Sequence, residues 1–487
     1  MRPLSEIYQV LGILAVVAIS CADLVASAAS ATLRREKAPT AKQLAKPDLI
    51  GLTERLGHTL EPFEHEYLTN LARAAGAELP TGVGQPGSPR EVWLAFRDAM
   101  DSALNDTSLH LSEPLARPRG DDSIFVSIAS YRDPSCSATV KDVYLRADRP
   151  WLVRVGVVQQ NCEAAKGCFT GKGWASTRRW VPAGPDPDCL TEFCASALGR
   201  PHCEAERVRI LRLPESEAYG PLFTRYLNAK LWRGETYFMQ IDSHTGFREG
   251  WDTTMVSMVK RTPSFPRSVI SSYPPSGTAE DSKAWARAAE TGEPTVEGLC
   301  SAQFEDLGQE TFTLRMGVTS LANPHARTGL RPPHAPFVAA GFLFAHSSFL
   351  AEVPPDPFLP SIFMGEEIAM SIRLWTSGYD IYAPSVNVVR HEYVRANHPK
   401  FWETVNMVFG GDFHNSLTAL LIGRVLHLLG DSSVSDSVLT RASQYGLGTN
   451  RTRDQFMEMA GLDMAKKEHR IPAWCRDGTS PPYSMSG

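Results

Sequence analysis

The chain has 487 residues, enough for one large enzyme domain with additions or for two or three ordinary domains. With 43% hydrophobic and 21% charged residues, its composition is typical of a globular protein and excludes a disordered or fibrous one. The formal net charge of -5 argues against nucleic acid as a partner, because proteins that bind nucleic acid are usually basic.

The N-terminus resembles a targeting segment. Arg2 precedes an apolar stretch over residues 10–22, and a run of alanine and serine follows over residues 26–31. The stretch is shorter than the roughly 20 residues of a membrane span, which favours a signal peptide. If Asp23 is tolerated within a longer span, the segment is an uncleaved signal anchor. We therefore predict a signal peptide or signal anchor over residues 1–31 and a protein of the secretory pathway, in the lumen or membrane of the ER or Golgi.

A stem or helical preface is predicted over residues 32–120. This part is polar and helix-prone, and it ends in a charged joint that contains proline, over residues 116–122. Its leucines recur at near-helical spacing, at Leu49, Leu52, Leu56 and Leu60.

After residue 122 the sequence pattern changes to one that predicts alternating strands and helices. Short apolar runs over residues 123–130, 153–159, 208–213 and 236–241 predict buried strands. Helical periodicity occupies residues 137–146, 217–233 and 368–377. This alternation predicts an α/β fold with a mostly parallel central sheet flanked by helices. We assign residues 121–430 to this catalytic domain and residues 431–487 to a C-terminal extension.

The cysteines point to an insertion within that domain. Eight of the nine lie outside the N-terminal segment, and five of these fall between Cys162 and Cys203, in a stretch rich in Gly, Pro and Asp. An even number favours disulfides in an oxidising compartment and a stapled insertion over residues 161–204. The alternative is a zinc site that includes His202, although paired C-x2-C spacings are absent.

The candidate metal ligands follow a predicted strand, where α/β proteins bind their ligands. Asp242 and His244 come directly after residues 236–241. A carboxylate and an imidazole at this spacing can face one divalent cation while Ser243 turns away. Manganese or magnesium held there would bridge the two phosphates of a nucleotide sugar. A plain strand-end turn would explain the same residues, and both interpretations stay open.

His391 is a candidate third ligand, because it follows the strand-like residues 386–389. A lone histidine is more often an ordinary exposed or hydrogen-bonded residue, and this alternative stays open.

Two other groups of polar residues are candidates for binding and catalysis. The first follows the strand over residues 123–130 and could bind a base or a phosphate, or form a capped turn; its residues are Ser130, Tyr131, Arg132 and Asp133. The second is the pair Glu366 and Glu367, which could orient a sugar hydroxyl or the acceptor. Acids in the first turn of a helix are also stabilised by its positive end, so this pair has a structural explanation too.

Several common enzyme classes lose support. The sequence contains no G-x-S-x-G elbow, P-loop or H-E-x-x-H motif, and no G-x-G-x-x-G follows the first predicted strand. These absences argue against common hydrolases, nucleotide triphosphatases and dehydrogenases.

Four long segments in order resemble glycosyltransferase family 60, the polypeptide and hydroxyproline α-N-acetylglucosaminyltransferases. They are SIFVSIASYRDP, FTRYLNAKLWRGETYFMQIDSHTGF, AGFLFAHSSFLAEVPPDPFLPSIFMGEEIAMSIRLWTSGYDIYAP and YGLGTNRTRDQFMEMAGLD. The resemblance implies a GT-A-type nucleotide-sugar transferase fold, a UDP-GlcNAc donor and a retained α-linked product. It also implies a protein acceptor with a hydroxyproline, threonine or serine hydroxyl.

The resemblance also implies roles for the candidate residues. Asp242 and His244 resemble the ends of the family's D-x-D-like metal motif, and His391 resembles a further ligand of Mn2+ or Mg2+. The loop of Ser130, Tyr131, Arg132 and Asp133 resembles the nucleotide-binding loop, and Arg225 a diphosphate contact. Glu366 and Glu367 resemble the acidic pair beside the sugar. Characterised adaptor-modifying relatives are cytoplasmic, so a cytoplasmic location is the alternative to the secretory pathway.

The mechanism we expect is front-face transfer, in which the acceptor hydroxyl attacks from the side that UDP leaves. A double displacement through Glu366 or Glu367 is the alternative. Two other functions stay open: a non-catalytic sugar- or protein-binding module on the same fold, and a secreted glycoside hydrolase that uses two acids.

Overall fold

The computed structural model describes residues 45–63, 88–113, 115–162, 168–170, 181–280, 291–308, 311–395, 398–402 and 411–485. The described residues from 45 onward belong to one compact unit. The predicted signal peptide or anchor therefore lies outside the described residues. Within the described ranges, no helix combines the length and the apolar character needed to cross a bilayer.

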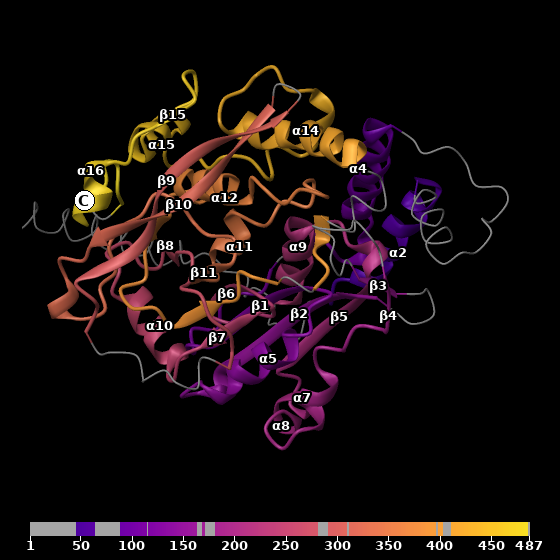
Figure 1. Ribbon diagram of the computed structural model, residues 1–487, viewed down its shortest axis with the longest axis horizontal. Helices are drawn as coiled ribbons and strands as arrows, with labels where there is room; N and C mark the ends of the chain where they lie inside the picture. The colour runs from indigo at the N-terminus through magenta and orange to yellow at the C-terminus, as the bar shows by residue number, and fades with distance from the viewer. Residues whose placement is uncertain are drawn as a thin grey trace, which may run out of the picture. The chain divides into compact units, whose positions relative to one another are not determined.

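A seven-stranded sheet lies at the centre of this unit (Figure 1). Its strands, in spatial order, are β12 (Asp380–Tyr382), β8 (Ser268–Ser271), β11 (Phe342–His346), β6 (Tyr237–Asp242), β1 (Ile124–Tyr131), β2 (Val153–Asn161) and β5 (Val208–Pro214). All neighbouring pairs are parallel except those of β11, which is antiparallel to β6 and to β8. The predicted α/β class with a mostly parallel sheet is confirmed, and all four predicted strands are present.

Each face of the sheet has its own hydrophobic core, because successive side chains of a strand point to opposite sides. On one face, Phe125 of β1 joins α9 (Pro221–Leu231) and α12 (Glu366–Thr376). On the other, Val126 joins α5 (Cys136–Leu145) and α10 (Trp251–Lys260). The helices and the sheet thus form three layers.

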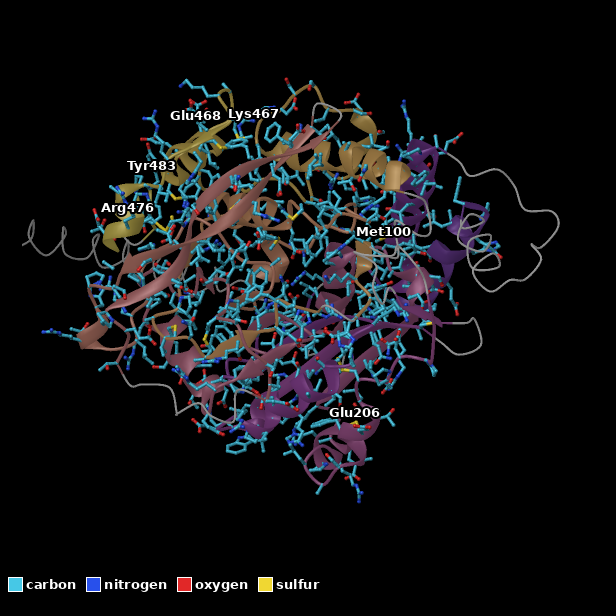
Figure 2. All side chains as sticks on the ribbon, in the orientation of Figure 1. Met100, Glu206, Lys467, Glu468, Arg476 and Tyr483 are labelled. Carbon is cyan, nitrogen blue, oxygen red and sulfur yellow. A yellow bond between two sulfur atoms is a disulfide. The ribbon has the colours of Figure 1, made fainter. Side chains whose placement is uncertain are left out.

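The described helices of the preface belong to the first of these cores. They are α2 (Leu49–Leu60) and α4 (Pro89–Asn105), whose apolar faces pack with α9. Figure 2 shows side chains filling the space between the helices and the sheet. Met100 of α4 is completely buried there, whereas Glu206 is exposed. The preface is therefore part of the folded unit, and the predicted domain boundaries stay predictions.

The remaining elements flank the sheet. A long hairpin is formed by β9 (Thr295–Gly308) and β10 (Thr311–Ala322). Two-stranded pairs are formed by β3 (Cys168–Thr170) with β4 (Val181–Ala183), β7 (Thr245–Phe247) with β13 (Val389–His391), and β14 (Leu462–Asp463) with β15 (Glu468–His469). The other helices are α7 (Thr191–Ala195), α8 (Arg200–Glu204), α11 (Phe349–Glu352), α14 (Gly411–Leu428), α15 (Arg453–Ala460) and α16 (Ala473–Asp477).

Disulfides, not zinc, account for the described cysteines. The bonds join Cys136 to Cys189, Cys194 to Cys203, and Cys300 to Cys475, and Cys162 is disulfide-bonded as well. The alternative zinc site is wrong, because the sulfur atoms are consumed in these bonds and the ring of His202 stacks on Tyr144.

Candidate active site

The site forms where β6 ends. Asp242 is the last residue of β6 and lies opposite Ala129 of the neighbouring parallel strand β1. The chain then turns through His244 into β7, which pairs with β13 so that His391 lies opposite Thr245. This pairing brings the imidazoles of His244 and His391 together, with ring centroids 4.5 Å apart.

Asp242, His244 and His391 form a cluster that could hold a metal ion, since their potential ligand atoms all lie within 4.8 Å of one another. The Nε2 atom of His391 is 3.0 Å from Oδ2 of Asp242. Burial raises the pKa of Asp242, but the hydrogen bond from His391 and the charge of Arg225 outweigh it and hold that pKa well below its usual range. A carboxylate with two imidazoles suits a divalent cation such as Mn2+. The residues therefore fit the predicted metal.

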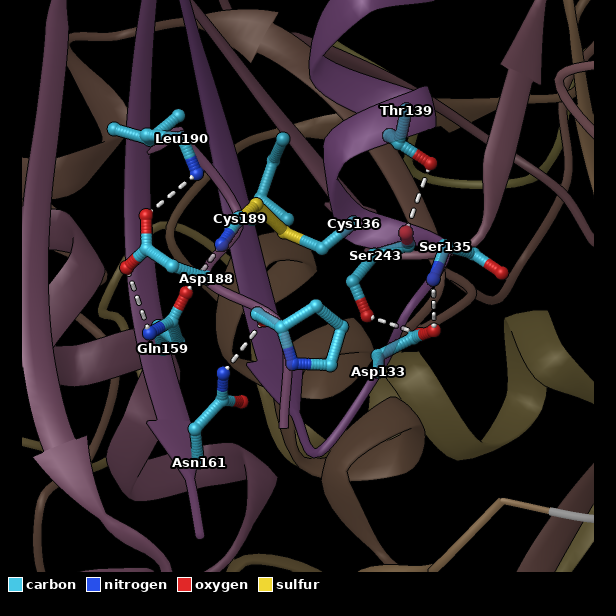
Figure 3. Close-up of a disulfide and its surroundings, with 12 residues drawn as sticks. Asp133, Ser135, Cys136, Thr139, Gln159, Asn161, Asp188, Cys189, Leu190 and Ser243 are labelled. Atoms are coloured by element: carbon cyan, nitrogen blue, oxygen red, sulfur yellow. Dashed lines mark hydrogen bonds between the residues drawn. A yellow bond between two sulfur atoms is a disulfide. The ribbon is translucent and has the colours of Figure 1, made fainter. Parts of the chain in front are cut away.

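Asp133 holds His244 in place. Its Oδ2 atom lies 2.7 Å from Nδ1 of His244 and accepts a hydrogen bond of 2.6 Å from Ser243 Oγ. Its Oδ1 atom accepts the backbone N–H of Ser135 at 2.9 Å, as Figure 3 shows. Because Asp133 is an acceptor, the proton of His244 resides on Nδ1 and the lone pair of Nε2 is left for a metal.

The Cys136–Cys189 disulfide lies beside this loop (Figure 3). It connects the start of α5 to the segment after Asp188, whose carboxylate is held by Gln159 and by Leu190 N. The disulfide thus fixes the residues that follow Asp133.

Arg225 of α9 connects the metal cluster to the acidic pair. Its guanidinium lies 3.2 Å from Oδ1 of Asp242 and 2.9 Å from Oε1 of Glu366. It also donates to the carbonyl oxygen of Ala340. Burial raises the pKa of Glu366 to about 7, although the charge of Arg225 opposes this shift. Arg225 therefore pairs with both acidic side chains and orients them.

Glu367 is held by two donors. The hydroxyl of Tyr273 donates to Oε2 at 2.6 Å, and the backbone N–H of Ala340 donates to Oε1 at 3.0 Å. Burial raises the pKa of Glu367, and the hydrogen bond from Tyr273 lowers it in part. Both oxygens of this carboxylate are thus engaged by the protein.

Two pockets meet at Asp242, Arg225 and His391. The first has a volume of about 260 Å³ and is lined by Ser130, Tyr131 and His244. The second has a volume of about 370 Å³ and is lined by Glu366 and Glu367. Phe363 and Tyr393 also line both pockets. The cluster therefore lies at the junction of two adjacent compartments, as a transfer between two bound molecules requires.

The structure brings most of the predicted residues to this junction but not all of them. Ser130 and Tyr131 line the first pocket. Arg132 does not line either one, because its guanidinium is buried against Asp186 with Nε 2.7 Å from Oδ2. Asp133 is likewise turned toward His244 and Ser243. Of the four predicted contacts to a nucleotide in this loop, only Ser130 and Tyr131 therefore line a pocket.

Sequence reasoning missed the segment after His391. Arg395, Lys400, Phe401 and Trp402 all line the first pocket. The Nη2 atom of Arg395 lies 3.6 Å from Asp133, so this cation is close to the metal cluster. The segment lacks helical or strand periodicity, which hides it from pattern analysis. Its mixture of cations and aromatic residues is the signal that could have revealed it.

The comparison with protein families agrees with these features. A family model described as Glycosyltransferase (GlcNAc) matches residues 123–466. Among solved structures, the crystal structure of GalNAc-T7 with UDP, GalNAc and Mn2+ is similar at 15% sequence identity and a TM-score of 0.40, over 81% of this chain and 71% of that one. No curated protein matches the sequence significantly.

Proposed function

The chain belongs to the GlcNAc glycosyltransferase family, and from this premise we propose that it transfers GlcNAc from UDP-GlcNAc to a hydroxyl group of a protein, with retention of configuration. The observation that carries the proposal is the cluster of Asp242, His244 and His391 at the junction of two pockets. Hydroxyproline, threonine and serine are the candidate acceptor residues.

The first pocket suits a nucleoside diphosphate. The cations of Arg395 and Lys400 supply positive charge for phosphate oxygens, and a metal ion held by Asp242, His244 and His391 would add to it. Tyr131 and Phe401, whose ring centroids are 5.9 Å apart, supply aromatic surface for a base. A bound Mn2+ or Mg2+, held by Asp242, His244 and His391, would supply Lewis acidity that offsets charge on the departing UDP.

The second pocket suits the sugar and the acceptor. Glu366 and Glu367 can accept hydrogen bonds from hydroxyl groups, and Arg225 lies between them and the metal cluster. In the transfer, the bond between the sugar's anomeric carbon and the UDP oxygen breaks while a bond to the acceptor oxygen forms. The acceptor proton passes to the departing phosphate oxygen.

Front-face transfer fits this site better than double displacement. Oε1 of Glu366 is paired with Arg225, and both oxygens of Glu367 are engaged by Tyr273 and Ala340 N. Attack through either oxygen of Glu367 would break one of its hydrogen bonds, and Glu366, whose pKa burial raises to about 7, is a poor nucleophile when protonated. The glutamates therefore position hydroxyl groups and leave the attack to the acceptor.

The secretory pathway is the proposed location. The disulfides Cys136–Cys189, Cys194–Cys203 and Cys300–Cys475 support it, because such bonds persist in oxidising compartments. In the reducing cytoplasm these cysteines would stay as thiols. The signal peptide or signal anchor over residues 1–31 stays a prediction from the sequence.

UDP release by the purified protein tests the proposal, with UDP-GlcNAc, UDP-GalNAc and UDP-glucose compared in the presence of Mn2+, Mg2+ or EDTA. We expect release from UDP-GlcNAc that requires the metal and is lost in Asp242→Ala. Asp454→Ala is the matched control, because the side chain of Asp454 is 90% exposed and does not line the pockets. Equal release by wild type and Asp242→Ala would refute the metal site.

Two further readouts separate the alternatives. Saturable binding of UDP-GlcNAc without release, in the presence of protein acceptors, would identify a non-catalytic binding module. The anomeric configuration of the product, measured by NMR, must be α, and a β-linked product would exclude front-face transfer.

A further inference from the structure

A third cavity lies apart from the two catalytic pockets. It has a volume of about 520 Å³ and shares no lining residue with them. Its walls come from residues 111–113 and 115–118, from the C-terminal half of α9, from α11 and from Gln444 and Tyr445. The N-terminal half of α9 lines the catalytic pockets instead, so the two sites occupy opposite ends of one helix.

The walls of this cavity are mainly apolar. The apolar and aromatic lining residues include Leu104, Leu111, Leu115, Ala229, Trp232 and Leu350. Small-molecule sites in proteins have volumes of this order and are typically apolar, with a few polar groups that fix the ligand's orientation.

Two polar groups beside this cavity have few partners: the ammonium of Lys230, which is half-buried, and the hydroxyl of Tyr226, which is fully buried. The ammonium of Lys230 donates to the carbonyl oxygen of Leu111 at 2.6 Å, but no carboxylate among the described residues forms an ion pair with it. The hydroxyl of Tyr226 is buried without a hydrogen-bond partner in the described part of the chain. Buried ammonium groups are usually paired with an anion, and buried hydroxyls are usually bonded.

The two groups lie close together. Lys230 Nζ is 5.3 Å from the centroid of the Tyr226 ring, and both residues line the cavity. Burial lowers the pKa of Lys230 to about 8, as expected for a cation without a counterion. An anionic oxygen in the cavity would accept a hydrogen bond from the ammonium of Lys230.

We propose that this cavity binds an aliphatic carboxylate, with its carboxylate at Lys230 and its hydrocarbon chain along the apolar walls. A single negative charge matches the single unpaired ammonium. Among the other charged residues that line the cavity, the carboxylates of Glu113 and Glu352 outnumber the guanidinium of Arg117, which disfavours a dianion such as a phosphate monoester. The proposal does not depend on the donor or the acceptor of the transferase.

Isothermal titration of the purified protein with decanoate, below its micelle concentration, tests the site. We expect saturable binding with one decanoate per chain and weaker binding of methyl decanoate, which has the same chain but no charge. Replacing Lys230 by Gln should weaken decanoate binding about tenfold to a hundredfold, because a charge-assisted hydrogen bond is lost. Gln is uncharged, polar and no larger than Lys, so the fold should be kept.

Two more variants make the result decisive. Lys466→Gln removes an exposed lysine outside the cavity and should leave the affinity unchanged. Ala229→Phe places a ring where the chain would lie and should abolish binding, with folding checked by circular dichroism. The proposal is refuted if decanoate does not bind, if the methyl ester binds equally well, or if Lys230→Gln binds like the wild type.

Discussion

Replacing Asp133 by Asn is the most informative test of how the metal site is built. The side chain of Asp133 is completely buried, and Asn has nearly the same shape. In the wild type one oxygen faces His244 and the other faces the backbone N–H of Ser135. Asn can place its oxygen at only one of these two positions, so the substitution changes hydrogen bonding rather than volume.

Either orientation of Asn carries a cost. If its amide nitrogen faces His244, the histidine must place its proton on Nε2 and loses the lone pair that would bind the metal. If its amide nitrogen faces Ser135, two donors meet in a buried place. Loss of a group that orients a metal ligand typically costs tenfold to a hundredfold in affinity, or about 1.4 to 2.7 kcal/mol. We expect Asp133→Asn to weaken Mn2+ binding by this factor.

The assay is a titration with Mn2+, in which electron paramagnetic resonance reports the free ion. Ser243→Ala is the matched control, because it removes the 2.6 Å hydrogen bond from Ser243 Oγ to Asp133 and leaves His244 in contact with the carboxylate. It should therefore weaken Mn2+ binding much less. An Asp133→Asn protein that is folded and binds Mn2+ like the wild type would refute the role assigned to Asp133.

Three further predictions concern stability. With the pKa of Lys230 lowered to about 8 by burial, the native state binds fewer protons than the unfolded state above that pH. The wild type should therefore gain up to about 2 kcal/mol relative to Lys230→Met between about pH 7.5 and about pH 9.5, measured by urea unfolding, and an unchanged difference would contradict this. Replacing Cys136 and Cys189 by Ser opens a bond between residues separated by 53 positions and should cost about 4 kcal/mol in the same assay, and a cost near zero would contradict the chain-entropy estimate. Arg424→Met leaves the buried carboxylate of Asp356 without its partner and should cost about 3 to 5 kcal/mol in thermal unfolding, whereas adding Asp356→Leu should restore part of it.

Local patterns predicted the elements of the sheet well. The strand predicted over residues 153–159 is present as β2, and the helix predicted over residues 217–233 is present as α9, Pro221–Leu231. The helix begins later than predicted because Gly220, with a φ of 91°, and Pro221 fix its start. Apolar periodicity is a local property, so one sequence suffices to find these elements.

Non-local pairing limited the prediction of the site and of the disulfides. His391 reaches Asp242, 149 positions away, only because β13 pairs with β7. The disulfide of Cys189 joins it to Cys136, outside the predicted insertion, because the start of α5 packs against the residues before α7. Cysteine count and spacing indicate disulfides but contain no information about which segments meet.

Strand pairing in the sheet brings the parts of the metal site together. Because β1 and β6 are parallel neighbours with Ala129 opposite Asp242, their carboxyl ends meet at one edge, and the loops beyond them must lie side by side. A single hydrogen bond between Asp133 in one loop and His244 in the other then fixes the orientation of the His244 ring, which is a candidate metal ligand. Substitutions in the buried strands should therefore change metal binding only through global unfolding, whereas a change at Asp133 should weaken it in a fully folded protein.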